Sequence, residues 1–287
     1  MSDAFGPPIH RPGTVAEARA LRAAHPRAQP VAGATAAQLG WPDGRAPAAL
    51  IDLSVLTDAA RGTPVRAEAG GLVLSAFATL ESVRLDARVR HALPALAALI
   101  GSIGSAPVRR LGTLGGNLCW PSGDLVPAML ALDARYVFAS AGEVDALAPG
   151  GMPADDLLVE IRVPLDARRV VLEKVGLRQA FSPTLVTVAM VDAGQGVRVA
   201  VGGGPTPAHR LPGVESLLAW GAPPASTRVL REAVVAAMQA RDDALASGAE
   251  RVAVASRVIS GHAAAFVRAA DADADAASDS STSAGRP

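Results

Sequence analysis

The sequence contains too few sulfur ligands for most metal or redox centres. Cys119 is the only cysteine among the 287 residues. One thiol cannot form a disulfide within the chain, complete a structural zinc site or hold an iron–sulfur cluster. Centres of these kinds are therefore excluded for the chain on its own.

The sequence is also poor in aromatic residues, and it has neither an excess of one charge nor long apolar runs. Aromatics make up 3% of the residues, so stacking platforms for nucleic-acid bases are not expected. The 27 basic and 27 acidic residues give a net charge of zero, so no strong field attracts nucleic acid or an anionic membrane. Apolar runs such as 95–100 are too short to span a bilayer, and residues 1–13 lack the apolar segment of a secretory signal. These absences predict a cytoplasmic protein with no membrane span.

The residues that are present are sufficient for a large folded structure. Half of the residues are hydrophobic, which is ample for a buried core, and the length suggests one large or two medium domains. Helical and strand patterns occur without a steady alternation, which favours an α+β fold over one doubly wound sheet. A domain boundary is predicted near 165–170. Residues 271–287 are polar and of low complexity, and are predicted to be disordered.

Local signals place several secondary-structure elements. Thr14 and Glu17 form a capping box at the start of a helix, while Thr79 and Asp124 are positioned to cap two later helices. Two β-branched runs around a Gly-Gln-Gly turn predict a hairpin over 185–204. Other strand-like runs lie within 28–41, 48–56, 65–83 and 157–174, and helices are predicted over 94–104, 226–247 and 250–270.

Two segments have the composition of an anion-binding turn. "TLGGN" (113–117) places two glycines directly after a threonine, and "VAGATA" (31–36) follows a predicted strand. Successive backbone N–H groups in such a turn can bind an anion, and glycine lets the backbone approach a diphosphate closely. Neither segment is a P-loop or a G-x-G-x-x-G motif. The alternative for each is a tight structural turn without a ligand.

Groups for acid–base or nucleophilic chemistry are sparse. The sequence has no H-x-x-x-H pair and no G-x-S-x-G motif. The histidines have no metal-ligand spacing; they are His10, His25, His91, His209 and His262. We therefore predict no catalytic and no metal-binding residues, and a chain of this kind would leave the chemistry to a cofactor.

An ordered set of stretches resembles the FAD-binding (medium) subunit of the molybdenum hydroxylase family, of the xanthine dehydrogenase and carbon monoxide dehydrogenase type. The strongest is "GSAPVRRLGTLGGNLCWPSGDLVPAMLALDA" (104–134), which is similar to that family's V-R-N-x-G-T-[IL]-G-G-N loop and the D-L-x-P-x-L-L-A-L-D-A helix after it. Supporting stretches follow in the family's order, among them "VAGAT" (31–35), "LIDLS" (50–54), "EIRVP" (160–164) and "LEKVGLRQAFSPTLVTVAM" (172–190). The resemblance covers roughly residues 12–220.

The resemblance implies FAD as the cofactor and assigns roles to particular residues. Backbone amides of a first loop would hold the diphosphate, and a second loop would leave room for FAD at its glycines and donate to it through Thr113 and Asn117. The first loop consists of Val31, Ala32, Gly33, Ala34, Thr35 and Ala36. The second consists of Thr113, Leu114, Gly115, Gly116 and Asn117. Outside the loops, Ile103 would contact the flavin, Asp124 would bind a hydroxyl of FAD, and Lys174 would contact the cofactor.

Lys174 is the only lysine in the chain. A compact ammonium group is not readily replaced by the planar fork of arginine, so a lone lysine fits a required point donor. The alternative is an exposed strand lysine paired with Glu173, since lysine is usually solvated.

The first loop departs from the family's pattern. The family usually has A-G-G-T-[DN] or A-G-G-x-S, whereas this chain has "AGATA", with Ala34 in place of the second glycine and Ala36 in place of the polar residue. A positive φ at Ala34 would cost about 1 kcal/mol or more. Ser75 also replaces a common glycine, and the C-terminal helix lacks a Tyr-Arg pair near 258–262. FAD binding could therefore be weakened.

The implied fold is α+β: a two-subdomain FAD-binding domain of the vanillyl-alcohol-oxidase/PCMH type, followed by a C-terminal domain of antiparallel sheet and helices. The expected boundaries are 1–165 for the FAD-binding domain (subdomains about 1–58 and 59–165), 166–270 for the C-terminal domain and 271–287 for the tail. The implied function is electron transfer from 2Fe-2S clusters through FAD to an acceptor such as NAD.

The implied partners are a small subunit with 2Fe-2S clusters and a large subunit with the molybdenum cofactor, in a heterotrimer or a dimer of heterotrimers. Two other hypotheses remain open. The first is a scaffold subunit of the same complex with weakened or lost FAD binding. The second is a stand-alone FAD oxidase of the vanillyl-alcohol-oxidase type, although the chain lacks a substrate domain and a His or Cys placed for covalent flavin attachment.

Overall fold

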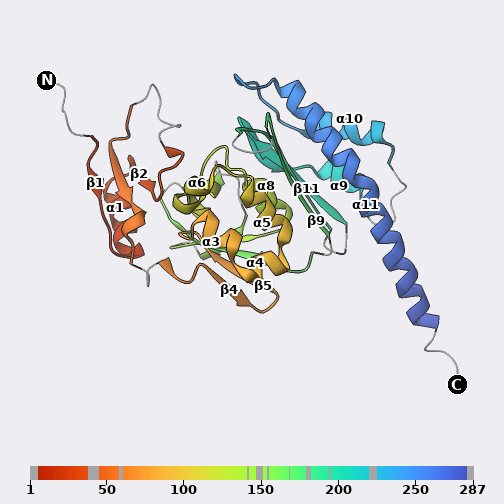
Figure 1. Cartoon of the computed structure of the whole chain (residues 1–287), viewed down its shortest axis with the longest axis horizontal. Helices are drawn as coiled ribbons and strands as arrows, with labels where there is room; N and C mark the ends of the chain where they lie inside the picture. The colour runs from red at the N-terminus through yellow and green to blue at the C-terminus, as the bar shows by residue number, and fades with distance from the viewer. Residues whose placement is uncertain are drawn as a thin grey trace.

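The chain folds into three sheets that lie side by side along its long axis (Figure 1). The computed structural model describes residues 6–37, 45–57, 61–140, 142–146, 151–153, 155–167, 169–178, 182–192, 194, 196–219 and 225–282. Strands and helices are mixed without a regular alternation, so the predicted α+β class is confirmed.

A small parallel sheet forms the N-terminal unit. Its strands are, in spatial order, β1 (Ile9–His10), β3 (Ala49–Asp52) and β2 (Ala28–Val31). The helix α1 (Val15–Ala24) begins at the predicted capping box: the Thr14 hydroxyl accepts from the Glu17 amide, and the Glu17 carboxylate accepts from the Gly13 amide. Because β2 ends at Val31, the segment 32–36 leaves this sheet at the carboxyl end of a strand.

An antiparallel sheet forms the central unit, and helices cover it. Its strands are, in spatial order, β4 (Val65–Glu68), β5 (Gly71–Ser75), β8 (Leu158–Pro164), β6 (Arg135–Phe138) and β7 (Gly142–Asp145). The helices between β5 and β6 are α3 (Leu80–Leu85), α4 (Ala87–Ala92), α5 (Pro94–Gly101), α6 (Ala106–Leu111), α7 (Leu114–Leu118) and α8 (Val126–Ala131). The predicted cap Thr79 accepts a hydrogen bond from Ser82 at the start of α3.

A second antiparallel sheet forms the C-terminal unit. Its strands are, in spatial order, β12 (Thr206–Arg210), β11 (Val197–Gly203), β10 (Thr184–Asp192) and β9 (Arg169–Gly176). The predicted hairpin over 185–204 is formed by β10 and β11. The helices α9 (Pro212–Leu217), α10 (Thr227–Ala237) and α11 (Gly248–Thr282) lie beyond this sheet from the central unit (Figure 1).

The strand β10 is buried on both faces. Val186, Val188 and Met190 pack with α10 and α11, whereas Ala189 and Val191 join the core of the central unit, in accord with the two-residue period of a strand. The helix α8 contacts β10, β11 and β12. The hydrophobic core of the central unit therefore continues into the C-terminal sheet.

Three local predictions are corrected by the structure. The helix predicted over 226–247 ends at Ala237, and the chain turns further on, where Asp243 accepts from the amides of Leu245 and Ala246. The helix predicted over 250–270 begins at Gly248 and continues to Thr282, into the segment 271–287. Asp124 does not cap α8, which begins after Leu125 without a side-chain cap.

No helix in the described part of the chain is long and apolar enough to cross a bilayer.

Candidate cofactor site

The two glycine-containing segments singled out in the sequence meet in space. A β-carbon at Gly33 would lie 1.9 Å from the carbonyl oxygen of Leu111 and 2.9 Å from the amide nitrogen of Gly112. The hydroxyl oxygen of Thr35 lies 3.0 Å from the position of a β-carbon at Gly112. Glycine at 33 therefore allows the segment 31–36, here called the first loop, to touch the backbone that enters the segment 113–117, here called the second loop.

The first loop has backbone amides that are available to a ligand. No described residue accepts a hydrogen bond from the amides of Gly33, Ala34, Thr35 or Ala36. Ala34 and Thr35 are exposed, and Val31 and Ala32 are half-buried at the end of β2. Consecutive free N–H groups next to a left-handed residue are the elements of an anion-binding nest.

Ala34 supplies that left-handed residue. Its φ of 50° lies in the region that disfavours residues with a β-carbon. The strain is about 1–2 kcal/mol for an L-residue. The first loop therefore keeps the conformation that the missing family glycine would adopt without strain.

The second loop is built differently, because it is the first turn of the short helix α7. The amides of residues 114–117 all have partners: Leu114 donates to the Ala78 carbonyl at 2.9 Å and Gly115 to the Ala76 carbonyl at 2.8 Å. Gly116 donates to the Thr113 hydroxyl at 3.1 Å, and Asn117 to the Thr113 carbonyl at 3.0 Å. The amides of residues 114–117 are therefore not available to a ligand in the way that the sequence-based description of this segment as an anion-binding turn expects.

The two glycines of the second loop have different surroundings. Gly115 is buried, and a β-carbon there would lie 2.9 Å from the Ala76 carbonyl oxygen, so its missing side chain makes room for the chain after β5. Gly116 is exposed, and a β-carbon there would meet only the Thr113 hydroxyl, at 2.9 Å. Of the two, only Gly116 leaves its open face toward solvent.

Thr113 and Asn117 both have structural partners. Thr113 is buried, caps α7 and forms an isolated bridge with Thr79. The Asn117 side-chain oxygen accepts from the Leu125 amide at 3.0 Å, which leaves its NH₂ group to donate. The Thr113 hydroxyl hydrogen and the Asn117 NH₂ group are thus the donors that the second loop retains.

Asp124 and Lys174 form a pair across the central and C-terminal units. The Lys174 Nζ lies 3.5 Å from an Asp124 carboxylate oxygen, with side chains 8% and 12% exposed. The hydroxyl of Thr184 on β10 donates to the other Asp124 oxygen. The alternative in which Lys174 is an exposed partner of Glu173 is wrong, since Glu173 pairs with His262 at 3.0 Å.

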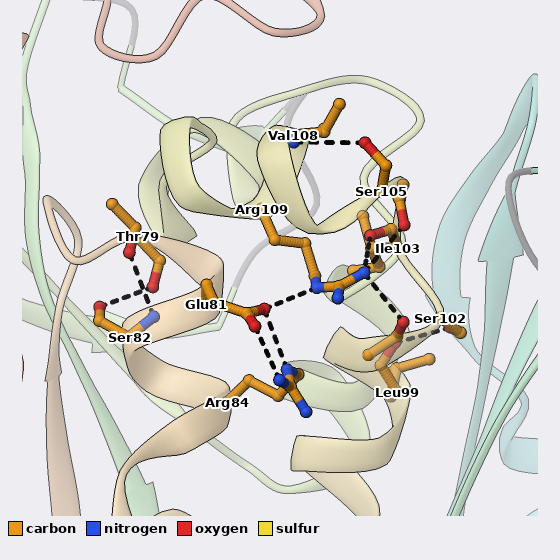
Figure 2. A network of polar contacts seen from close by, with 12 residues as sticks. Thr79, Glu81, Ser82, Arg84, Leu99, Ser102, Ile103, Ser105, Val108 and Arg109 are labelled. Atoms are coloured by element: carbon orange, nitrogen blue, oxygen red, sulfur yellow. Dashed lines mark hydrogen bonds and ion pairs between the residues drawn. The ribbon is translucent and has the colours of Figure 1, made fainter.

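The remaining predicted residue, Ile103, lies in a short loop after α5 and is buried. Arg109 on α6 holds this loop: its Nη1 donates to the carbonyls of Gly101, Ile103 and Gly104 at 3.1, 3.2 and 2.9 Å (Figure 2). The sequence analysis assigned no role to Arg109. Its position as the arginine of the family's V-R-N-x-G-T pattern was a signal that could have found it.

Glu81 on α3 completes this network. Its carboxylate accepts from Arg84 at 2.7 Å and from Arg109 at 2.7 Å (Figure 2). Hydrogen bonds from Arg84, and then from Arg109, lower the pKa of Glu81 from 4.5 to about 2. Glu81 is therefore ionised at neutral pH and fixes the guanidinium of Arg109.

The amides of residues 33–36, which have no acceptor in the described part of the chain, have the arrangement of an anion-binding turn. Comparison with known protein families supports the same kind of ligand: residues 3–166 match the model described as "FAD binding domain in molybdopterin dehydrogenase". The chain belongs to this family. FAD is the family's cofactor, and the free amides of the first loop fit its diphosphate.

Solved structures and curated proteins add two comparisons for this FAD-binding chain. It is similar to a chain of carbon monoxide dehydrogenase from Hydrogenophaga pseudoflava (TM-score 0.77, 23% identity, covering 93% of this chain and 98% of that one). It is similar to a chain of quinoline 2-oxidoreductase from Pseudomonas putida 86 (TM-score 0.74, 22% identity, 93% and 98% covered). These likenesses show the fold.

Among curated proteins, the chain is 35% identical over 150 residues to the uncharacterized protein YgfM of Escherichia coli K12. The match covers 51% of this chain and 56% of that protein, so it spans little more than half of the relative's length. Among the described residues of this chain, no three His, Cys, Asp or Glu side chains converge as metal ligands.

Proposed function

We propose that the chain is the FAD-carrying electron-transfer subunit of a molybdenum-containing hydroxylase or dehydrogenase of the xanthine dehydrogenase type, acting in the cytoplasm. It would pass electrons from 2Fe-2S clusters of a partner subunit to an acceptor such as NAD. The observation that carries the proposal is the first loop, with its free amides held against Leu111. Bound FAD would supply electron and hydride exchange, which no side chain of this chain provides.

In this proposal each part of the chain has a binding or positioning role. The amides of residues 33–36 bind the diphosphate, and the Thr113 hydroxyl and the Asn117 NH₂ group donate from the second loop. Gly116 leaves the surface beside them open. Leu114 and Gly115, both buried, anchor α7 beneath these groups.

The other end of the cofactor is assigned to the loop after α5. In this proposal Ile103 contacts the flavin, Asp124 binds a hydroxyl of FAD, and Lys174, which pairs with Asp124, contacts the cofactor. Because the two side chains neutralise each other within a nearly solvent-free junction, they order this region without adding net charge.

The partners are proposed from the family resemblance, which assigns the 2Fe-2S clusters to a small subunit and the molybdenum cofactor to a large one. The single cysteine of this chain agrees with this assignment, because one thiol cannot hold an iron–sulfur cluster. The proposed assembly is a heterotrimer or a dimer of heterotrimers. Organic substrate would then bind in the large subunit, and this chain would only exchange electrons.

The test is to purify the chain and measure bound flavin by its visible absorbance before and after incubation with FAD. We expect about one FAD per chain, held through a diphosphate contact. FMN, which has one phosphate, should bind much more weakly than FAD. A colourless protein that takes up no added FAD would contradict the proposal.

The strained Ala34 motivates the second candidate, a scaffold subunit with weakened or lost FAD binding. The variant Ala34→Gly separates the two. If the wild type stays colourless and Ala34→Gly takes up FAD, the scaffold function is supported. If both bind FAD, the electron-transfer function is supported.

A further inference from the structure

Two positively charged side chains donate to successive backbone carbonyls of the loop after α5. The carbonyls of Gly101, Ile103 and Gly104 accept from Arg109, and that of Ser102 accepts from the Lys174 ammonium at 3.3 Å. The last carbonyls of a helix have no partner within the helix, and positive charge is favourable there. Four successive carbonyls are thus held by two side chains, which we call the carbonyl clamp.

The two cations come from different parts of the fold. Arg109 lies on α6, immediately after the loop, whereas Lys174 lies on β9 of the C-terminal sheet. Lys174 also donates to the Ser182 carbonyl at 3.2 Å and pairs with Asp124. The clamp therefore fixes the loop both to its own unit and to the C-terminal unit.

Arg109 is itself held rigidly. Its side chain is 11% exposed and that of Glu81 is 10% exposed, and their ion pair is 2.7 Å long. The planar guanidinium can donate to Glu81 through Nε and to three carbonyls through Nη1, which a lysine cannot do. Arg84, the second partner of Glu81, makes no such contact with the loop carbonyls, because its hydrogen bonds go to the carboxylate.

The helix α6 joins this clamp to the other end of the site. It runs from Ala106 to Leu111, about 9 Å at 1.5 Å per residue, and its last carbonyl is the one that touches Gly33. A β-carbon at Gly104 would lie 2.9 Å from Val108, so the loop packs directly onto α6. Movement of the loop after α5 would therefore either shift the first loop through α6 or change the distance between these two loops.

We infer that Arg109 is a positioning residue of the FAD site, fixed by Glu81, and that it sets the distance between the Ile103 loop and the first loop. The inference rests on the proposed function for its ligand. Arg109 itself makes no contact with the cofactor in this proposal. Its effect is to hold Ile103 where the flavin binds while the amides of 33–36 hold the diphosphate.

The experiment compares Arg109→Gln with two matched controls. Arg84→Gln removes the other ion pair of Glu81 without touching the loop carbonyls, and Arg110→Gln changes the exposed neighbour on α6. For each variant, FAD affinity is measured by quenching of flavin fluorescence, together with the visible spectrum of the bound flavin. Hydrogen exchange of the Ser102 and Ile103 amides reports on the loop itself.

We expect Arg109→Gln to weaken FAD binding about tenfold or more, because several charge-assisted hydrogen bonds are lost. It should also change the flavin spectrum and speed exchange at Ser102 and Ile103. Arg84→Gln and Arg110→Gln should retain wild-type affinity and spectrum. Arg109→Lys, which keeps the charge, should recover part of the affinity, and Glu81→Gln should show a smaller loss than Arg109→Gln.

Wild-type affinity, spectrum and exchange in Arg109→Gln would overturn the inference. An equal loss of FAD affinity in Arg84→Gln would overturn it as well, because the loss would then come from a weakened α3 and not from the loop carbonyls. If Arg109→Gln fails to fold, Arg109→Lys and Glu81→Gln decide by the same measurements. Failure of the proposed function is distinct from these outcomes, since it would appear as absence of FAD uptake in the wild type.

Discussion

The first and second loops look alike in sequence and differ in what their amides do. Both combine glycine with threonine and small or apolar residues, and Gly33 of the first loop packs against Leu111, two residues before the second loop. The amides of the second loop are consumed by Ala76, Ala78 and Thr113, whereas the amides of the first have no acceptor among described residues. A loop that can bind a ligand differs from a structural one in whether its backbone amides already have acceptors within the protein, and not in its number of glycines.

The proposed function thus makes the second loop the support and assigns the ligand to the first loop, which departs from the family pattern. The second loop matches the family's G-T-[IL]-G-G-N pattern fully, and its conformation is locked by α7. The first loop has lost a glycine, yet Ala34 adopts the left-handed conformation. The following predictions test this division of roles, from the largest expected effect to the smallest.

The variant Gly33→Ala should have the largest effect, because it separates the two loops. Its β-carbon, fixed directly to the backbone, would lie 1.9 Å from the Leu111 carbonyl oxygen, which is itself a backbone atom. We expect a loss of about 3 kcal/mol or more in the free energy of unfolding, since neither side can yield. Denaturant unfolding and FAD titration measure the result, and FAD uptake should be lost.

Gly13→Ala is the matched control, since its β-carbon would meet only a Glu17 oxygen at 3.5 Å, an ordinary contact. Wild-type stability and FAD uptake in Gly33→Ala would show that the loops are not in contact.

The variant Gly115→Ala should affect stability but leave FAD affinity nearly unchanged. Its β-carbon would lie 2.9 Å from the Ala76 carbonyl oxygen, so α7 must shift, at a cost of about 1–3 kcal/mol less the gain in helix propensity. Thermal unfolding of the apo-protein and FAD titration of the folded fraction separate the two effects. A large fall in affinity without a fall in stability would mean that the second loop is the principal ligand loop.

Acid should act on the ion pairs that Glu81 forms with Arg84 and Arg109 and leave the first loop unaffected. Glu81 has a folded-state pKa of about 2, below its ordinary value of 4.5, so its stabilising contribution is fully present above pH 4.5 and is lost as the pH falls toward 2. The first loop contains no titratable side chain.

We therefore expect the difference in melting temperature between the wild type and Glu81→Gln to shrink as the pH falls from 6 to 3, within the window set by the two pKa values. Melting curves at a series of pH values give this difference. A constant difference across the series would show that the Glu81 carboxylate is not the group responsible.

The smallest expected effect is that of Ala34→Gly, which relieves the strained residue. The gain from removing the left-handed strain is partly offset by the greater freedom of glycine in the unfolded chain, which leaves about 0.5–1 kcal/mol. Thermal unfolding of the apo-protein measures it. Ala32→Gly, at a residue without positive φ, should instead lose stability.

Sequence reasoning identified both loops, because glycine, threonine and their order along the chain are local signals. It also predicted most strands, the hairpin of β10 and β11, and the caps Thr14 and Thr79. It could not predict that Ala76 and Ala78 consume the second loop's amides, since those acceptors come from another segment.

The residues that link units were misjudged for a similar reason. Asp124 is a residue type that is favoured at helix caps. Its carboxylate instead accepts from Thr184 and pairs with Lys174, both on the C-terminal sheet. Long-range pairing of this kind leaves no periodic pattern in the sequence. Local propensity also failed at 238–247, where the chain is not helical and the Asp243 side chain accepts from the amides of Leu245 and Ala246.

Lys174 has a practical consequence for chemical labelling. The chain carries a single lysine, and the fold places its amine at the junction of two sheets with a side chain 8% exposed. Amine-reactive reagents therefore have one side-chain target, and it is shielded while the junction is closed. The rate at which that amine is acylated would therefore report how often the C-terminal sheet separates from the remainder of the protein.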